Sequence, residues 1–384
     1  MQKIRVLYIM VGEGGSDHAL LTSLQYLKGE VEAYVLLGRR ATANTLKMLE
    51  EAHVPYEVWK YKFFWWNGVP YRFLKHLQMV KLWWQRHYWK KKVIQKVKQW
   101  DIQLIHTNTS AYQFGLLAAR ALKIPHVWHF REYQTLDFNK LHAFSLNSVM
   151  ALSSTPGNYN IAITKGIYDF YRFSDRNSRI IYDAVAKSFV QEVKVDSPFF
   201  LYVGRLVVEK GLFCLLHAYE KYCLQGGSCH LYLVGELSSE VSSYLEGLKQ
   251  HPLILEKIHI CGKQSIPVVY GYMQQAEALI VPSPFEAFGL ITAEAMLNHC
   301  LVLGRDVAGT QEQMDNGLSF TGDEIAVRFK SEDDLVECLK RVACQGTLDF
   351  ISMKERAYRT VVSLYDVTMN ASCLLDVYRK LVIA

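Results

Sequence analysis

The sequence predicts an α/β fold built from two doubly wound domains. A chain of 384 residues is too long for one ordinary hydrophobic core. Short apolar runs alternate with helix-like stretches, and most runs lack period-2 alternation, as is typical of parallel strands covered on both faces. The predicted strands are Ile4–Val11, Val31–Leu37, Gln103–His106, His126–Phe130, Asn160–Ile163, Phe199–Val203, His230–Val234, Lys257–Ile260, Ala278–Val281 and Leu301–Leu303.

The domain boundary is predicted from a change in composition near residue 190. All eight tryptophans lie before residue 130, and all eight cysteines lie after residue 210. The segment Gln191–Pro198 is polar and ends in proline, which is typical of a linker. We therefore expect an N-terminal domain over residues 1–190 and a C-terminal domain over residues 191–366. The last helix, within residues 367–384, is expected to complete the N-terminal domain.

Composition excludes several classes of protein. With 50% hydrophobic and 21% charged residues, the chain is globular rather than disordered. No apolar run approaches the roughly 20 residues that span a bilayer, and the first apolar stretch is interpreted as a strand rather than a signal peptide. The cysteines form no C-x-x-C pair, which argues against a zinc site or a disulfide framework and favours the reducing cytoplasm. The net charge of +6 permits a phosphate-rich partner without requiring one.

The segment Pro282–Met296 carries the strongest indication of a site. A strand runs into a loop that contains proline and glycine, and an apolar helix begins near Gly289 or Leu290. The amides of Phe288, Gly289 and Leu290 would lie at a helix N-terminus, where an anion is favoured. Glu286 and Glu294 flank these amides, and their carboxylates can accept hydrogen bonds from hydroxyls. On spacing alone, a strand–loop–helix unit with two solvated glutamates is an equal alternative.

A second segment, Phe199–Tyr219, places two cations after a strand. The strand ends at Gly204, and Arg205 and Lys210 follow before an apolar helix. Ligands of doubly wound sheets bind at the carboxyl ends of the strands, so these cations could clamp a diphosphate. Taken singly, each is better interpreted as surface charge on a loop.

Together the two segments resemble the retaining glycosyltransferases of the GT-B fold, family 4, of the bacterial capsule and exopolysaccharide type. The resemblance rests on the order strand-GR-x4-KG-helix followed by PSxxEAFGLxxxEAM, with the runs YLVGE, IHICGK and YMQQAEALIVPS between them and AGTQE after them. It is strongest over residues 199–312. It implies two Rossmann-like domains that face a cleft, with the nucleotide sugar bound by the C-terminal domain.

The resemblance also implies roles for N-terminal residues. Gly14 and Gly15 follow the first strand like the family's Gly-Gly loop, which lies near the donor phosphates and the acceptor. The run IPHVWHFREY resembles a His-bearing strand end, and His129 would then face the reacting sugar on the acceptor side. Without the motif, a satisfied core histidine is the favoured interpretation of His129. The run IIYDAV departs from the family's Asn-Gly-Val turn, with Asp183 and Ala184 in place of Asn-Gly.

The implied mechanism stabilises a leaving diphosphate with Arg205, Lys210 and the amides near Gly289. Glu286 would bind the hydroxyls of the sugar, and Glu294 the ribose diol. The family retains anomeric configuration and generally needs no metal, and the sequence has no D-x-D string; no cofactor is expected beyond a nucleotide sugar, with a UDP-sugar favoured. The implied catalytic residues are Glu286, His129, Arg205 and Lys210, and the implied donor-binding residues are Gly15, Gly204, Arg205, Lys210, Gly262, Glu286, Phe288, Gly289, Leu290 and Glu294.

Residues Tyr56–Trp100 form a basic aromatic region. It holds seven of the eight tryptophans and many Lys and Arg residues, with Glu57 as its one acid. Phe73, Leu77, Val80, Trp84 and Tyr88 recur at helical spacing, and Arg72, Lys75, Lys81, Arg86 and Lys90–Lys92 surround them. Basic amphipathic helices with tryptophan commonly lie in a lipid interface. A core helix with a solvated face is the alternative, and a nucleic-acid surface is not expected because no known binding motif accompanies the region.

These observations favour a glycosyltransferase that works peripherally on the cytoplasmic face of the membrane. Its acceptor is expected to be a lipid-linked saccharide of surface polysaccharide biosynthesis, held near an anionic membrane surface by residues 56–100. Two alternatives remain at this point. A sugar-nucleotide epimerase of the same fold would need no lipid acceptor, and a catalytically silent partner subunit would only bind sugar nucleotide or membrane.

Overall fold

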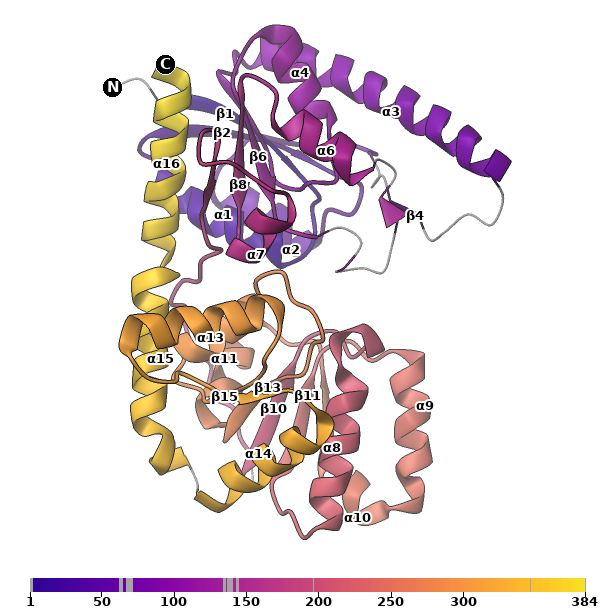
Figure 1. Ribbon diagram of the computed structural model, residues 1–384, viewed down its shortest axis with the longest axis vertical. Coiled ribbons are helices and arrows are strands. Elements are labelled where there is room, and N and C mark those ends of the chain that lie inside the picture. The colour runs from indigo at the N-terminus through magenta and orange to yellow at the C-terminus, as the bar shows by residue number, and fades with distance from the viewer. Residues whose placement is uncertain are drawn as a thin grey trace. The chain divides into compact units, whose positions relative to one another are not determined.

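The computed structural model describes residues 3–61, 65–66, 72–133, 136, 141–142, 145–195, 197–345 and 347–383. Contacts divide the chain into two compact units (Figure 1). Unit 1 comprises Met1–Ala184 and Val367–Ala384, and unit 2 comprises Val185–Asp366. The division therefore follows Ala184, whereas the sequence analysis placed it after residue 190.

Unit 1 is built on a seven-stranded sheet in the order β3-β2-β1-β5-β6-β8-β9. Every neighbouring pair in it is parallel. Its strands are nearly continuous apolar runs because helices cover both faces. The strands are β1 Ile4–Met10, β2 Val31–Leu37, β3 Tyr56–Val58, β5 Leu104–Thr107, β6 His126–Phe130, β8 Asn158–Ala162 and β9 Ser178–Ile180. A separate antiparallel pair joins β4 Trp65–Trp66 to β7 Leu141–His142.

Two apolar clusters lie on opposite faces of this sheet. One contains buried residues of α1 and α16 together with side chains of β1, β2 and β8. The other contains residues of α3 and α4 with the alternate side chains of β1 and β5. The helices are α1 Gly15–Leu27, α2 Ala43–Glu51, α3 Arg72–Gln99, α4 Phe114–Leu122, α6 Leu146–Ser153, α7 Lys165–Phe170 and α16 Val367–Ile383.

Unit 2 repeats this plan with a six-stranded parallel sheet in the order β12-β11-β10-β13-β14-β15. Its strands are β10 Phe199–Val203, β11 His230–Val234, β12 Ile258–Gly262, β13 Ala278–Val281, β14 Val302–Arg305 and β15 Val327–Phe329. Its helices are η1 Val208–Lys210, α8 Leu212–Leu224, α9 Ser239–Gly247, η2 Leu248–Gln250, α10 Pro252–Leu255, α11 Ile266–Gln275, α12 Leu290–Leu297, α13 Ala308–Thr321, α14 Glu332–Gln345, η3 Thr347–Phe350 and α15 Ile351–Leu364. The predicted doubly wound α/β class is confirmed in both units.

Each sheet reverses its strand order at one point. In unit 1 the chain moves outward from β1 through β2 to β3 and then resumes on the other side with β5. In unit 2 the same reversal separates β10 from β13. Loops at the carboxyl ends of two such strands diverge to opposite faces and leave a crevice, where ligands of open α/β sheets bind. The fold therefore predicts ligand sites at the loops after β1 and β5 in unit 1 and after β10 and β13 in unit 2.

The last helix of the chain belongs to the core of unit 1. In α16, Leu374 and Tyr378 are fully buried within the cluster that contains Tyr8 and Leu24, and α16 packs against α1. The Tyr378 hydroxyl also lies 2.6 Å from Nδ1 of His106 on β5. None of the helices in the described ranges has the length and hydrophobicity of a membrane-spanning helix.

A matched pair of substitutions in α16 tests this packing. Leu374→Ala removes a fully buried side chain and should lower the stability of unit 1 by about 2–5 kcal/mol. Met369→Ala, at a side chain that is 53% exposed on the same helix, should change it by less than about 0.5 kcal/mol. Hydrogen exchange measures the effect, which should appear at β1 amides and not at β10 amides. Equal protection of β1 in the two variants would contradict the assignment.

Candidate active site

Two loops of unit 2 leave the sheet where its strand order reverses. Strands β10 and β13 are adjacent and parallel, with Leu201 opposite Leu279. Their carboxyl ends therefore lie at the same edge of the sheet, and the loops that start at Gly204 and Pro282 leave from neighbouring points. These loops contain most of the donor-site residues that the sequence analysis named.

Gly211 holds these two loops in contact. Its φ of +71° is in the left-handed region, which favours glycine. A β-carbon at this position would lie 2.1 Å from the carbonyl oxygen of Pro282, well inside van der Waals contact. The backbones can approach this closely only because residue 211 has no side chain.

This approach brings Lys210 to Glu286. The Lys210 Nζ lies 2.7 Å from Oε1 of Glu286, although the two residues are 76 positions apart. The Ser283 hydroxyl donates to the same carboxylate oxygen, also at 2.7 Å. Both charged side chains keep some accessible surface, 30% for Lys210 and 17% for Glu286. A cation and a carboxylate that the sequence analysis assigned to one site are therefore in direct contact and within reach of a ligand.

Arg205 contributes a second cation at the end of β10. Its side chain is exposed, and its carbonyl accepts a hydrogen bond from the Tyr202 hydroxyl at 2.9 Å. Burial raises the pKa of Tyr202, and the charge of Glu286 adds to that rise. Tyr202 therefore stays a neutral donor that fixes the backbone turn on which Arg205 lies.

The N-terminus of α12 lies next to the Lys210–Glu286 pair. Gly289 is its N-cap residue with a φ of +87°, and no side chain caps the helix. Phe288 is buried, whereas Gly289 and Leu290 are partly exposed. Backbone amides at a helix N-terminus attract anions. The sequence predicts that this helix begins near Gly289 or Leu290, and it begins at Leu290.

Hydrogen bonds from helix α13 hold the loop between β13 and α12 in place. The Gly309 amide donates to the Glu286 carbonyl at 2.8 Å, and a β-carbon on Gly309 would lie 2.6 Å from the Ala287 carbonyl oxygen. The side-chain amide of Gln313 donates to the backbone carbonyls of Phe288, at 2.5 Å, and Gly289, at 3.1 Å. The AGTQE run includes Gly309, whereas Gln313 was not predicted from the sequence; its place one turn further along the helix was its available signal.

Glu294 lies one turn into α12 and is partly buried. Burial raises its pKa from its ordinary value to about 7, although a hydrogen bond with Tyr270 acts in the opposite direction. Near neutral pH both the protonated and the ionised form of this carboxyl group are therefore populated. Its ionised form accepts hydrogen bonds from hydroxyls more strongly than its neutral form.

Three glycines lie at the carboxyl ends of the neighbouring strands β10, β11 and β12, at the same edge of the sheet as Lys210. A β-carbon on Gly235, after β11, would lie 1.7 Å from the Gly204 carbonyl oxygen. The Gly235 amide in turn donates to the Gly262 carbonyl at 2.9 Å. Gly204 and Gly262 were named from sequence, while Gly235 was quoted only within the YLVGE run. Together they leave this edge without side chains, so that a flat ligand could approach the backbone.

Unit 1 gathers a buried polar network at its own strand reversal. Gly14 and Gly15, predicted on the acceptor side, begin helix α1, and Gly14 has a φ of +90°. The Asp17 carboxylate accepts from the Gly12 amide at 2.6 Å and from the Asn108 side chain at 2.8 Å. Burial raises the pKa of Asp17 to about 6, and these two hydrogen bonds oppose the rise. Asp17 therefore ties the glycine loop after β1 to the end of β5.

Arg131 is the centre of this network, although it was not predicted from the sequence. Its Nε donates to the Asn108 side chain at 2.6 Å, and its Nη1 pairs with the Asp183 carboxylate. Both side chains of the ion pair are almost fully buried. Asp183 was noted only as a departure from the family's turn. The available signal was a charged residue shortly after each of two strands, Arg131 after β6 and Asp183 after β9.

His129 lies in the interior of unit 1. Its side chain has no exposed surface, and its Nδ1 is 3.2 Å from Nε2 of His106. Burial holds the pKa of both imidazoles well below their usual range, so the rings are neutral. Nε2 of His129 has no hydrogen-bond partner within the part of the chain that the structure describes. A buried polar atom without a partner costs about 1–3 kcal/mol, and other buried side-chain atoms of the described residues, such as Thr292 Oγ1, share this state.

The unit 2 arrangement combines groups for two kinds of ligand atom. Arg205, Lys210 and the helix N-terminus can hold phosphate oxygens, while Glu286 and Glu294 can accept from hydroxyls. Within the described residues, no three His, Cys, Asp or Glu side chains are placed to share a metal ion.

Comparison with known proteins identifies similar sequences and folds. Residues 185–348 match a family model described as glycosyl transferases group 1. The alpha-D-kanosaminyltransferase of Streptomyces kanamyceticus is 24% identical over 190 residues, 48% of this chain and 46% of that protein. The serotype-specific mannosyltransferase WbdA of Escherichia coli is 29% identical over 139 residues, 36% of this chain and 17% of that protein. The chain thus spans less than half the length of these two relatives.

Similarity to solved structures extends over nearly the whole chain. HepE of Anabaena, solved with UDP, has a TM-score of 0.72 and is 18% identical, with 98% of this chain and 100% of that chain covered. The same protein has also been solved with UDP-glucose. The chain therefore has the GT-B fold of two Rossmann-like domains, and its residues 185–348 match the glycosyl transferases group 1 family.

Proposed function

We propose that the protein is a glycosyltransferase that moves a hexosyl group from a nucleotide-diphosphate sugar to a saccharide acceptor. The observation that carries the proposal is the contact between Lys210 and Glu286 at the strand reversal of unit 2. In a nucleotide sugar, the diphosphate and the sugar are joined through one oxygen. Its binding site therefore needs a cation for the phosphate next to a carboxylate that accepts hydrogen bonds from the sugar hydroxyls. The match of unit 2 to the group 1 family supports the same conclusion.

The chemistry follows from how charge moves during transfer. The bond between the anomeric carbon and the diphosphate oxygen breaks, a bond to the acceptor oxygen forms, and the acceptor's proton passes to the leaving phosphate. Negative charge grows on the diphosphate, where Lys210, Arg205 and the amides of Phe288, Gly289 and Leu290 would stabilise it. The configuration of the anomeric carbon would be retained by attack from the same face.

Glu286 and Lys210 would exchange partners when the donor binds. Without ligand, each charge is balanced by the other at 2.7 Å. A diphosphate would compete for Lys210 and leave the Glu286 carboxylate to accept hydrogen bonds from the hydroxyls of the sugar. Glu294 would accept from the ribose diol, and Gly204 and Gly262 would allow close approach to the strand ends. We favour a UDP-sugar as donor, since HepE has been solved with UDP and with UDP-glucose.

The acceptor side is proposed to lie in unit 1. Gly14 and Gly15 lie after β1 at the strand reversal, where the buried Asp17 fixes the loop. His129 is retained as a proposed acceptor-side residue because its Nε2 has no partner in the described residues; its side chain is fully buried, so an acceptor hydroxyl would reach it only after neighbouring side chains move.

Helix α3 supports a lipid-linked acceptor at a membrane surface. Leu77, Val80, Trp84 and Tyr88 are 52–65% exposed and lie on one helix face, since their spacing is three or four residues. Lys81, Lys91 and Lys92 are also exposed. Residues 62–64 and 67–71 of the basic aromatic region, and the side chains of Arg72, Phe73 and Lys75, lie outside the described residues.

An apolar stripe with flanking cations matches the chemistry of an anionic lipid interface. We therefore propose peripheral binding on the cytoplasmic face of the membrane and a role in surface polysaccharide biosynthesis. The relative WbdA is named a serotype-specific mannosyltransferase, which favours such a role.

The diphosphate clamp predicts a large loss of turnover in Lys210→Gln. Removal of one preorganised donor from such a site lowers the rate about 10²–10³-fold. Lys249→Gln, at an exposed lysine of the same unit, serves as the control. A panel of UDP- and GDP-sugars is scored for hydrolysis and transfer, with product analysis to separate transfer from epimerisation. Activity should persist in EDTA, because we propose no metal. Turnover of Lys210→Gln within twofold of the control would refute the clamp.

Glu294 predicts a pH dependence of donor affinity. If only the ionised carboxylate holds the ribose diol, lowering the pH from 8 to 6 should weaken UDP-glucose binding about tenfold, because the pKa lies near 7. The diphosphate of UDP-glucose is a diester and does not titrate over this range. Isothermal titration of Glu294→Gln should give weaker binding with a flat pH profile. The same slope in this variant as in the wild type would show that another group titrates.

The exposed stripe of α3 predicts salt-sensitive binding to anionic vesicles. Trp84→Ala should reduce sedimentation with phosphatidylglycerol vesicles, because Trp84 is 65% exposed. Phe189→Ala, at a 75% exposed aromatic residue in unit 2, should bind like the wild type. Raising the salt from 0.1 to 1 M shortens the Debye length from about 10 to about 3 Å and should weaken binding. If the wild-type protein does not bind these vesicles at low salt, the membrane proposal is contradicted.

A further inference from the structure

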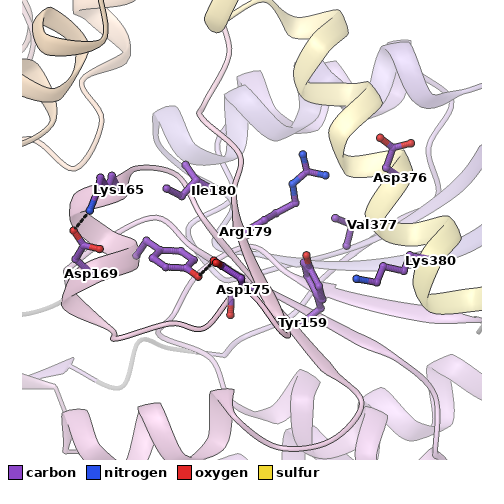
Figure 2. Close-up of a pocket in the computed structure, with 11 residues that line it drawn as sticks. Tyr159, Lys165, Asp169, Asp175, Arg179, Ile180, Asp376, Val377 and Lys380 are labelled. Atoms are coloured by element: carbon purple, nitrogen blue, oxygen red, sulfur yellow. Dashed lines mark hydrogen bonds and ion pairs between the residues drawn. The ribbon is translucent and has the colours of Figure 1, made fainter. Parts of the chain in front are cut away.

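A pocket of unit 1 lies between α7, β9 and α16 (Figure 2). Lys165 pairs with Asp169 at 2.5 Å, and the Tyr168 hydroxyl donates to Asp175. Three cations and three carboxylates line the pocket in all: Lys165, Arg179, Lys380, Asp169, Asp175 and Asp376. Because these charges balance, the pocket favours neither an anion nor a cation, and we assign no ligand to it.

Gln313, on helix α13, donates two hydrogen bonds to the loop that precedes α12. Its side chain is only 1% exposed. Its Nε2 lies 2.5 Å from the carbonyl oxygen of Phe288 and 3.1 Å from that of Gly289. Because the two acceptors are consecutive in the chain, one side-chain amide fixes two successive peptide groups.

The direction of these two carbonyls sets the direction of the amides that follow them. Both peptide groups are trans, and in a trans peptide the C=O and N–H bonds point in opposite directions. The carbonyls of Phe288 and Gly289 point toward Gln313, so the amides of Gly289 and Leu290 point away from α13. Neither amide donates to another group of the described residues, and both residues are partly exposed. A ligand can therefore approach them.

Gly309 acts in the same direction from one turn earlier on α13. It lies four residues before Gln313, on the same face of the helix, and its amide donates to the Glu286 carbonyl at 2.8 Å. Helix α13 thus binds three carbonyls of the loop from one side. The Gly309 contact comes from the backbone, whereas the Gln313 contacts come from a side chain that can be replaced without changing the backbone.

Packing alone does not account for a glutamine at residue 313. Its Oε1 is buried and has no partner among the described residues, and a buried acceptor without a partner lowers stability. The reversed amide would set Oε1 against two carbonyl oxygens that repel it. An apolar side chain would avoid the unsatisfied oxygen but would leave the Phe288 carbonyl without this donor. These features favour a role in directing the two peptide groups.

We propose that Gln313 is a positioning residue that aims the amides of Gly289 and Leu290 at the phosphate next to the sugar. The inference rests on the proposed function, since it needs a nucleotide sugar at the Lys210–Glu286 pair. The two amides follow Glu286, which would bind the sugar hydroxyls, by three and four residues, so the phosphate that they meet is the one linked to the sugar. Donors that are fixed before the ligand arrives stabilise its charge without reorganisation. Gln313 itself contacts no ligand.

Titration calorimetry on the full chain tests the proposal with UDP and GDP, each compared with its monophosphate, UMP or GMP. The wild type should bind at least one diphosphate more tightly than its monophosphate. Gln313→Met has a similar shape and no donor. It should lower the affinity for that diphosphate about tenfold, near the low end of the range for loss of a hydrogen bond to a charged group. The affinity for the monophosphate should stay within about twofold, whereas a loop that had only lost packing would bind both nucleotides more weakly.

Gln311→Met is the matched control, because it makes the same change at an exposed position of the same helix and should bind like the wild type. Gln313→Leu is a second variant without a donor, and thermal unfolding shows whether each variant is folded. An unchanged preference for the diphosphate, equal weakening of both nucleotides, or unfolding of both Gln313 variants would overturn the positioning role and leave the proposed function intact. A wild type that binds neither diphosphate more tightly than its monophosphate would contradict the proposed function, and this inference with it.

Discussion

The close approach of Gly211 to the carbonyl of Pro282 is the constraint on which the candidate site of unit 2 depends. It is possible because β10 and β13 are parallel neighbours, so that their loops leave one edge of the sheet together. The approach sets Lys210 against Glu286, and Gly309 holds the second loop from behind. A methyl group at residue 211 or 309 would collide with backbone rather than with a flexible side chain. The position of the charged pair is therefore a property of the backbone.

In unit 1, buried charged side chains hold the loops at the strand ends in place. Asp17, Arg131 and Asp183 are almost fully buried, and breaking up such an arrangement by removing one member typically costs several kcal/mol. Replacing a complete buried network by apolar residues is often neutral or stabilising, so stability alone does not account for it. The network joins the ends of β1, β5 and β6 to the segment after β9. We infer that it fixes the loops at this edge, including the glycine loop that begins α1.

Much of the fold could be predicted from the sequence, because buried parallel strands are apolar throughout. Val31–Leu37 and Phe199–Val203 have the bounds that the sequence analysis gave. The edge strands Ser178–Ile180 and Val327–Phe329 were missed, since three residues are too few for a pattern. Residues of the site could be predicted where a local sequence motif contains them, as at Glu286. Contacts such as that between Asn108 and Asp17, 91 residues apart, leave no local pattern. They arise only when the strand order brings their loops together.

The central claim is that a nucleotide sugar binds at the Lys210–Glu286 pair. A crystal structure of the full chain with UDP-glucose tests it most directly, because it locates the diphosphate and the sugar independently of turnover. The account predicts phosphate oxygens within hydrogen-bond distance of the Lys210 Nζ and of an amide among Phe288, Gly289 and Leu290. It also predicts that Glu286 releases Lys210 and contacts the sugar. A diphosphate bound elsewhere, with the Lys210–Glu286 contact still at 2.7 Å, would contradict it.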